Sequence, residues 1–180
     1  MTSDALPHAK AHDESVQIVA DLYEQFYKPI CTYLYCLVDE RDLAHDLAQE
    51  TFLQVFYTRH RLATVENQRA WIYRIATHLA LNKLKRQRRF RWLPWHQAED
   101  LPTFHWRTLD EEFHQRAAVE QAMSALPPHY RAPLLLYSHY GFTIREIAVA
   151  LERKESTVKV QLHRARELFQ QAYAVENRDE

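Results

Sequence analysis

Two short helices joined by a tight turn are predicted by residues 143–169, which read TIREIAVALERKESTVKVQLHRARELF. Thr143 begins the first helix, and Glu146 three residues later completes a capping box, a pattern typical of helix N-termini. Apolar residues then recur at helical spacing and form one buried face of this helix. Those residues are Ile144, Ile147, Ala148 and Leu151.

The second helix of this stretch carries two contrasting faces. Ser156 is its cap candidate, and the buried stripe consists of Val158, Leu162, Ala165 and Phe169. The opposite face carries Ser156, Lys159, Val160, His163 and Glu167, flanked by Arg164 and Arg166. Small, hydrogen-bonding and cationic side chains can reach base edges in a major groove while arginines hold phosphates. The pair fits a helix-turn-helix, but an ordinary antiparallel helix pair with a solvated basic face fits the same pattern.

Charge is distributed very unevenly along the 180 residues. The overall net charge is −1, and 47% of residues are hydrophobic, as in a globular protein. Residues 1–56 hold 3 basic and 10 acidic side chains, net −7, whereas residues 57–91 hold 10 basic and 1 acidic, net +9. An acidic block beside a basic one indicates two different partners on adjacent surfaces.

Several classes of protein are disfavoured by the sequence. It has no apolar run long enough to span a bilayer and no signal-peptide core, so we expect a cytoplasmic protein without membrane insertion. Cys31 and Cys36 point in different directions on a predicted helix and are expected to be free thiols. A single glycine indicates an almost entirely helical, all-α chain. No carboxylate cluster or complete metal-ligand set appears, so we expect neither an enzyme nor a cofactor.

Two helices are predicted before residue 58. Asp13 can cap the first, which ends near Val38 and which Pro29 is expected to kink or restart. The second covers residues 39–57. The inward residues of the first helix are Val16, Val19, Leu22, Phe26 and Ile30. Those of the second are Leu43, Leu47, Phe52 and Val55. The other face of the second helix is an acidic strip of Asp42, Asp46, Gln49 and Glu50.

A polar connector, residues 59–68, leads to a third long helix that Asn67 can cap and that extends to about Arg89. Its core stripe is Ala70, Trp71, Ile75, Ala76 and Leu79. It ends in KLKRQRRFR, residues 83–91, where six of nine residues are Lys or Arg. Trp71, Tyr73 and Arg74 near its start suit stacking on single-stranded nucleic acid. The same aromatic residues could equally belong to the core.

The chain divides into two helical domains. We expect a disordered tail (1–12), a first domain (13–91), an extended linker (92–112), a second domain (113–173) and a tail (174–180). Trp92, Trp95 and Trp106 suggest that the linker packs against something. Helices resume near Leu109, with Val119, Met123 and Leu126 inward, and Pro127 and Pro128 end that segment. A further helix, 129–139, leads through Gly141 to the opening motif.

These motifs together resemble the bacterial sigma factors of the extracytoplasmic-function (group IV, sigma-70 family) type. LAHDLAQETFLQVF (43–56) resembles region 2.2, and RAWIYRIATHLALNKLKRQRR (69–89) resembles regions 2.3 and 2.4. ALPPHYRAPLLLYSHYGFTIREIAVAL, followed by ESTVKVQLHRAREL, resembles region 4. The resemblance covers about residues 15–90 and 115–172 and implies a transcription initiation factor that directs RNA polymerase to a subset of promoters. The alternative is a classical helix-turn-helix regulator whose first domain binds an effector or dimerises.

The resemblance implies a role for each surface. Core RNA polymerase would bind Asp42, Asp46, Gln49, Glu50 and Phe52. Single-stranded minus-ten DNA, with a flipped base held by the connector, would meet Arg61, Thr64, Val65, Asn67, Trp71, Tyr73, Arg74, Lys85, Arg86, Arg88 and Arg89. Double-stranded minus-thirty-five DNA would meet Ser156, Thr157, Lys159, Val160, His163, Arg164 and Arg166. An anti-sigma factor is a further partner that the resemblance implies.

Glu152 departs from the family pattern, which has glycine after the first helix of the helix-turn-helix. The turn should need a left-handed residue there, and glycine adopts that conformation without a Cβ penalty. Two explanations are open. Either Glu152 is strained at positive φ, or Arg153 and Lys154 let the turn take another path. We favour strain.

Overall fold

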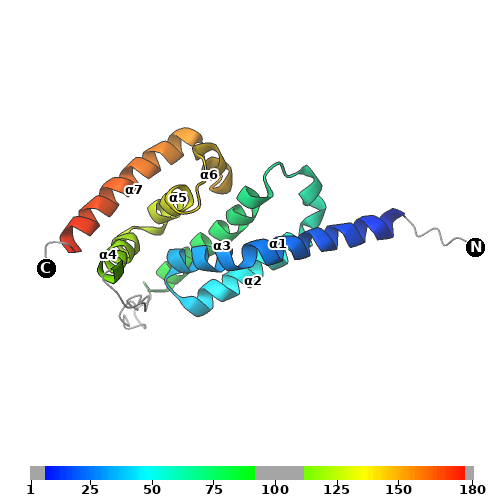
Figure 1. Cartoon of the computed structure of the whole chain (residues 1–180), viewed down its shortest axis with the longest axis horizontal. Helices are drawn as coiled ribbons and strands as arrows, with labels where there is room; N and C mark the ends of the chain where they lie inside the picture. The colour runs from blue at the N-terminus through cyan, green and yellow to red at the C-terminus, as the bar shows by residue number, and fades with distance from the viewer. Residues whose placement is uncertain (1–6, 92–111, 177–180) are drawn as a thin grey trace, which may run out of the picture.

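The structure, a computed structural model, describes residues 7–91 and 112–176, with side chains described for 15–87 and 118–175. Every regular element in these ranges is helical, which confirms the all-α prediction (Figure 1). The elements are α1 (Pro7–Val38), α2 (Arg41–Tyr57), the 3-10 helix η1 (Arg59–Thr64), α3 (Gln68–Arg91), α4 (Glu112–Ala125), α5 (Pro128–Ser138), α6 (Ile144–Ala150) and α7 (Glu155–Glu176). Residues 92–111 of the predicted linker, which include its three tryptophans, lie outside the described residues, and Glu112 begins α4.

The first unit consists of α1, α2, η1 and α3, and its predicted core is largely confirmed. The inner faces of α1 and α2 are buried as expected, at Val19, Leu22 and Ile30 and at Leu43, Leu47 and Val55. Asn67 caps α3, since its Oδ1 accepts a hydrogen bond of 2.9 Å from the backbone N–H of Ala70.

The structure corrects the predicted start of α1 and excludes a restart at Pro29. The helix begins at Pro7 rather than after Asp13, so residues 7–12 are not part of a tail. Proline suits the first helical position, where its missing N–H would have no partner. Pro29 does not restart the helix, because α1 is continuous through it. Tyr33 and Leu34, one turn later, are fully buried, and this packing offsets the hydrogen bond that proline removes.

The second unit consists of α4 to α7 and contains the predicted helix-turn-helix. Its capping box is confirmed: Glu146 N–H donates to Thr143 Oγ1 over 3.2 Å, and Thr143 N–H donates to Glu146 Oε2 over 2.8 Å. Ser156 is not the cap of the second helix, because α7 begins at Glu155 and places Ser156 in its first turn. Val119 was also predicted wrongly, since its side chain is 41% exposed while Leu126 is buried. The helix α7 continues three residues past the predicted boundary at residue 173.

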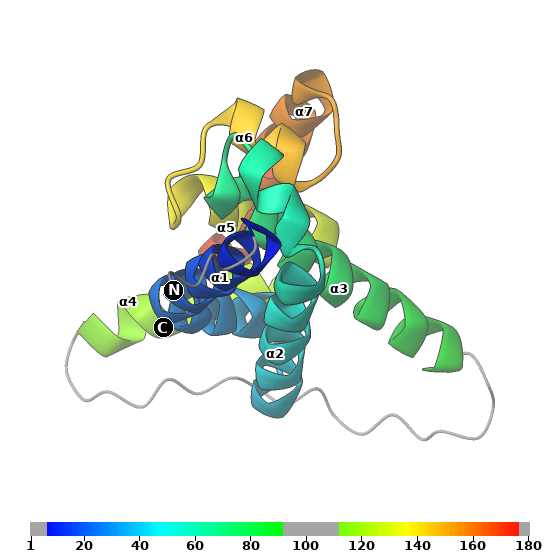
Figure 2. The ribbon, with the colours of Figure 1, turned by 90° about the vertical axis from the view of Figure 1, so that its right-hand side faces the viewer.

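One apolar core joins the two units. α3 packs beside α6, and α5 packs against α1 (Figures 1 and 2). Tyr140, between α5 and α6, places its ring centroid 5.6 Å from Tyr33 and 5.2 Å from Tyr73 of the first unit. Arg131 of α5 is buried and donates to the carbonyl oxygens of Cys36 and Leu37 at the end of α1, over 3.3 and 3.4 Å. The predicted domains are therefore in extensive contact.

Candidate nucleic-acid interface

The acidic strip lies on the exposed face of α2. Asp42, Asp46, Gln49 and Glu50 are all exposed, and none of the three carboxylates forms an ion pair with a side chain that the structure describes. Carboxylates without an internal partner are available to a basic partner. Phe52 does not belong to this surface, because it is 5% exposed and packs edge-on against Tyr23 at 5.0 Å.

Two apolar side chains extend the acidic strip and were missed from the sequence. Leu53 is 54% exposed and Tyr57 is 71% exposed. Leu53 follows Gln49 by four residues and Tyr57 follows Leu53 by four, so both lie on the same helix face as the acidic strip. The four-residue spacing in the sequence could have shown that these two apolar side chains continue the acidic strip. The face of α2 thus combines negative charge at its start with exposed apolar area at its end, a combination found at protein interfaces.

The predicted polar connector contains a 3-10 helix, η1, whose Leu62 side chain is buried. Arg59 holds the preceding turn, since its guanidinium lies 4.6 Å from the ring centroid of Phe56 and donates to the Phe56 carbonyl over 3.0 Å. Arg61 and Thr64 remain exposed, and Val65 is half-buried. The connector therefore presents short polar and cationic side chains from a fixed backbone.

The aromatic residues at the start of α3 are buried. Trp71 is 6% exposed and Tyr73 is 1% exposed, and burial raises the pKa of Tyr73. Tyr73 contacts Tyr33 from its own unit and Phe142 from the second unit, with ring centroids 5.2 and 5.0 Å away. In this arrangement the two residues are core. Arg74 stays partly exposed and forms an ion pair with Glu152, its Nη1 3.3 Å from Oε1.

The cationic end of α3 extends away from the body of the molecule (Figure 2). Lys85 and Arg86 are exposed there. The side chains of Arg88 and Arg89 lie outside the described set, although both residues are helical. Arg74, His78, Asn82 and Lys85 line one continuous stripe of α3 that faces a cleft closed on its other side by Arg153 and Gln161 of the second unit.

The turn between α6 and α7 shows that Glu152 is strained. Its φ is 52°, in the left-handed region. Glu152 N–H donates to the Val149 carbonyl over 3.3 Å, and Arg153 N–H donates to the Ala148 carbonyl over 2.9 Å. These two bonds form the Schellman motif that usually contains glycine. The turn thus keeps the ordinary path, which confirms the first of the two explanations.

The exposed face of α7 contains the whole predicted minus-thirty-five set. Val158, Leu162 and Ala165 are buried on the other side. The exposed residues are Ser156, Thr157, Lys159, Val160, His163, Arg164 and Arg166. The Arg166 side chain is turned toward α5, where its guanidinium lies 5.0 Å from the ring centroid of Tyr137, whereas no described contact to another helix holds the other cationic side chains of this face. The helix therefore presents a single surface of mixed apolar, polar and cationic groups.

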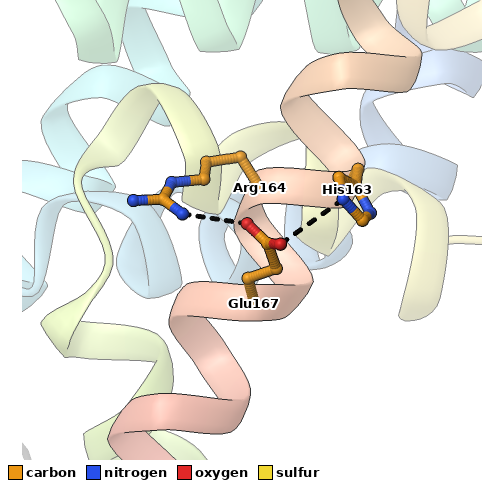
Figure 3. A network of polar contacts seen from close by, with 3 residues as sticks. All are labelled: His163, Arg164 and Glu167. Atoms are coloured by element: carbon orange, nitrogen blue, oxygen red, sulfur yellow. Dashed lines mark hydrogen bonds and ion pairs between the residues drawn. The ribbon is translucent and has the colours of Figure 1, made fainter.

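Glu167 holds two of these side chains together (Figure 3). Its Oε2 accepts a hydrogen bond of 2.9 Å from Arg164 Nη1, and its Oε1 lies 3.4 Å from His163 Nε2. The hydrogen bond from Arg164 lowers the pKa of Glu167. This contact was not predicted, although three- and four-residue spacing on a helix is the known signal for such pairs.

The described residues form no site for metal chemistry and no membrane span. No three His, Cys, Asp or Glu side chains among them are grouped so that they could hold a metal ion. None of the helices in the described ranges is long and apolar enough to cross a bilayer. What the structure presents instead is an all-α protein with exposed acidic and basic surfaces and a helix-turn-helix.

Comparison with protein families identifies this class. The family model "Sigma-70 region 2" matches residues 22–90, and "Sigma-70, region 4" matches residues 116–169. The two matches coincide with the two units of the fold. The chain belongs to the sigma-70 family, in its extracytoplasmic-function (ECF) group. It is an RNA polymerase sigma factor that directs promoter-specific initiation, and the alternative of a classical helix-turn-helix regulator is not favoured.

Individual sigma factors are similar over most of the chain. The ECF RNA polymerase sigma factor SigX of Bacillus subtilis is 28% identical over 155 residues, which span 79% of this chain and 77% of that protein. The RNA polymerase sigma factor YlaC of Bacillus subtilis is 29% identical over 161 residues, 86% of this chain and 90% of that protein.

Solved structures share the fold. One is the sigma factor RpoE in complex with the anti-sigma factor NepR from Bartonella quintana, with a TM-score of 0.66, 20% identity and coverage of 87% of this chain and 96% of that chain. Another is CnrH in complex with the cytosolic domain of CnrY, with a TM-score of 0.62, 18% identity and coverage of 96% of both chains. Below, the first unit is called region 2 and the second region 4.

Proposed function

We propose that this sigma factor uses three separate surfaces to bring core RNA polymerase to a promoter. They are the α2 face of region 2, the connector with α3, and the exposed face of α7. The observation that carries the proposal is the α7 face, where the seven side chains expected to meet DNA are all exposed and the apolar stripe is buried.

Core polymerase would bind the α2 face. Asp42, Asp46 and Glu50 have no cationic partner among the described side chains, so a basic surface can approach them without first breaking an internal ion pair. Leu53 and Tyr57 would add apolar contact area next to these charges. The proposed target of the whole α2 face is the coiled coil of the large polymerase subunit, as the family resemblance implies.

Minus-ten DNA would bind along the connector and α3. Arg61, Thr64, Val65 and Asn67 would form the pocket for a flipped base, whose extrusion costs a few kcal/mol that contacts must return. Arg74 lies beside this pocket on α3. The exposed cations Lys85 and Arg86, followed by Arg88 and Arg89, would hold the duplex backbone upstream. Trp71 and Tyr73 would act mainly as the rigid core beneath this surface.

Minus-thirty-five DNA would bind the face of α7. A recognition helix places its N-terminal residues against base edges in the major groove. Ser156, Lys159, Val160 and His163 lie along that part of the helix, with Arg164 beside them. Val160 is 68% exposed, and an apolar side chain here suits contact with a thymine methyl group.

The proposal also covers where the protein acts, whether it catalyses a reaction, and what controls it. The protein would act in the cytoplasm, where its polymerase is, and would not itself catalyse a reaction. An anti-sigma factor would control it. The last point is supported by the similar folds of RpoE and CnrH, which were solved in complex with NepR and with the cytosolic domain of CnrY.

Run-off transcription tests the proposal directly. Core RNA polymerase is supplied with the purified protein and with genomic fragments, and transcripts are mapped to their start sites. Defined starts that depend on the added protein are expected, with core enzyme alone as the control. If the protein binds core enzyme but yields no defined start, its role in promoter recognition is refuted. If it does not bind core enzyme, the proposal fails at its first step.

A further inference from the structure

The face of α7 that would bind minus-thirty-five DNA contains a carboxylate among its cations. Glu167 lies one turn beyond His163 and Arg164 and uses a different oxygen for each (Figure 3). Its Oε2 is 2.9 Å from Arg164 Nη1, and its Oε1 is 3.4 Å from His163 Nε2. A carboxylate on a DNA-binding surface repels phosphates, so attraction of the DNA backbone does not account for Glu167.

An exposed pair of this kind can also do no more than stabilise its helix. Opposite charges three or four residues apart do so weakly, and solvent screens them. The exposed fractions of the side chains are 41% for Glu167, 52% for Arg164 and 78% for His163. Helix stabilisation needs only one partner, however, whereas Glu167 engages two side chains that are both expected to meet DNA. The carboxylate therefore affects how both are presented.

Glu167 favours one of the two proton positions on the His163 ring. A neutral imidazole has one N–H donor and one acceptor nitrogen, and the partner of one nitrogen fixes the role of the other. Because Oε1 of Glu167 lies beside Nε2, its negative charge favours the proton on Nε2. Nδ1 is then left as an acceptor. It forms no hydrogen bond with a residue that the structure describes, and the exposed ring can bring it to a base edge.

An acceptor nitrogen selects a particular kind of base. In the major groove cytosine and adenine present an amino group as a donor, whereas guanine and thymine present O6 and O4 as acceptors. Nδ1 as an acceptor therefore suits cytosine or adenine on the contacted strand. A histidine with its proton on Nδ1 would suit guanine or thymine instead. The position of one proton thus changes which base the same side chain prefers.

Arg164 is constrained by the same carboxylate. One of its five guanidinium N–H donors is directed to Glu167 Oε2, toward the C-terminal side of α7. The guanidinium is thereby held away from the first turns of the helix, which would meet base edges. Its remaining donors stay available for a phosphate, a contact that carries no sequence information.

We propose that Glu167 is a positioning residue of the recognition helix. It presents His163 Nδ1 as an acceptor to a cytosine or adenine of the minus-thirty-five element, and it holds Arg164 for a phosphate. Glu167 itself touches neither base nor phosphate in this arrangement. The inference rests on the proposed function, since it assumes that the face of α7 lies in the major groove.

Three variants of the full-length chain, each assembled with core RNA polymerase, test this role. Glu167→Gln keeps the side-chain length but supplies an amide N–H that can donate to His163 Nε2, which moves the ring proton to Nδ1. His163→Ala removes the ring, and a double variant combines the two changes. Glu155→Gln is the matched control, since it removes another exposed carboxylate two turns earlier in α7. Circular dichroism first establishes that all four proteins retain wild-type helical content.

The first readout is the loss of a single amino group from the DNA. Binding selections from randomised minus-thirty-five sequences identify the position at which His163→Ala loses its base preference. The cytosine or adenine of that base pair is then replaced by 2-pyrimidinone or by unsubstituted purine, which lack the amino group. This replacement should weaken binding by wild type and by Glu155→Gln about two- to ten-fold, because one hydrogen bond is lost. His163→Ala should not respond to it.

The second readout is a reversal of base preference. At the same position and on the same strand, Glu167→Gln should prefer guanine or thymine by about two- to ten-fold. Its preference at the other minus-thirty-five positions should match wild type. The double variant should show the same preference as His163→Ala, because Glu167 acts on the base only through the histidine ring.

An unchanged preference in Glu167→Gln would overturn the positioning role and leave the pair as a stabiliser of the helix. An effect of Glu167→Gln that persists without the ring would overturn it as well, because Glu167 would then contact the base itself. So would wild-type binding that does not respond to loss of the amino group. If His163→Ala alters the preference at no position, base reading by α7 has failed, and the inference fails with it. The His163→Ala result thus separates failure of the proposed function from failure of the positioning role alone.

Discussion

Arg74 of α3 and Glu152 of the α6–α7 turn form an ion pair, with Nη1 of the former 3.3 Å from Oε1 of the latter. Their side chains are 33% and 59% exposed, so solvent screens the pair, which is worth at most about 1 kcal/mol. The left-handed backbone at Glu152, with φ 52°, costs roughly 1–2 kcal/mol for a residue other than glycine. The side chain and the backbone of Glu152 therefore affect stability in opposite directions.

Glu152→Gly and Glu152→Gln separate these two effects. Both variants lose the ion pair, but only the glycine relieves the backbone strain. The glycine variant should be the more stable by about 1 kcal/mol, which corresponds to a melting temperature about 2–4 °C higher. Differential scanning calorimetry of the full-length chain measures this difference. A glycine variant less stable than the glutamine variant would mean that the left-handed turn is not strained.

Charge reversal on the α2 face tests the polymerase contact. Asp46→Lys with Glu50→Lys should weaken binding to core RNA polymerase, because like charges then face the basic partner surface. Helical content should not change, since both side chains are exposed. Glu24→Lys, an exposed position on α1, is the control and should bind core enzyme like wild type. Unchanged core affinity in the double variant would exclude the acidic strip from the interface.

Phosphate-binding and base-reading residues should respond differently to substitution. Arg88→Ala or Arg89→Ala should weaken promoter binding by the holoenzyme on all sequences. The slope of log affinity against log salt should become shallower by about 1, because one phosphate contact is lost. Filter-binding titrations over a range of salt concentrations measure this slope.

His163→Ala and Lys159→Ala are the contrasting case for that prediction. Each should relax base preference at particular minus-thirty-five positions, by about 1–3 kcal/mol for a good contact. Binding selections from randomised minus-thirty-five sequences give the preference at each position. Equal, sequence-independent losses from the α3 and α7 variants would show that α7 does not read bases.

Val160 is predicted to read a thymine methyl group. Replacing the contacted thymine by deoxyuridine removes only that methyl, so binding should weaken by about 0.8 kcal/mol. Val160→Ala should bind the two DNAs nearly equally. Competition titrations of the holoenzyme with each substituted promoter provide the measurement. Wild-type binding that is insensitive to deoxyuridine at every minus-thirty-five thymine would contradict this role.

Glu146 should contribute to the acid stability of the chain. Hydrogen bonds from the backbone N–H and then the hydroxyl of Thr143 lower its pKa below 4.5. A carboxyl group whose pKa is lower in the folded state stabilises the fold above its unfolded pKa and loses this effect as the pH falls through the folded pKa. The free energy of unfolding of Glu146→Gln should therefore fall less steeply below about pH 4.5. Urea titrations between pH 3 and 6 test this, and Glu24→Gln should keep the wild-type slope.

Local patterns predicted the helices well and the contacts between them poorly. The capping box at Thr143 and the apolar stripe at Val158 depend on neighbours three or four residues away, so the sequence contains all the information they need. The predicted restart at Pro29 was wrong because the cost of proline is local, whereas the packing of Tyr33 and Leu34 that offsets it comes from the tertiary fold. Tertiary packing overrides local propensity in such cases.

The contact between regions 2 and 4 could not be predicted from spacing. Tyr33, Tyr73 and Tyr140 are separated by 40 residues or more in the chain, and an aromatic residue suits a core as well as it suits a base. Trp71 and Tyr73 were left open between these alternatives for the same reason. Phe52 shows a different error: its spacing placed it correctly on the inward face of its helix, but the family resemblance also assigned it to the polymerase surface, although its ring is buried against Tyr23.

The aromatic contact at Tyr140 also limits how freely the halves of this protein can be exchanged with those of a relative. A chimera that joined its region 4 to another sigma factor's region 2 would place the Tyr140 ring against side chains that need not accommodate it. Because Tyr33, Tyr73 and Tyr140 pack in one core, a substitution at one of them should require a compensating substitution at the others. Promoter specificities built from separate minus-ten and minus-thirty-five modules would be combinable only when the residues at this junction are transferred as one set.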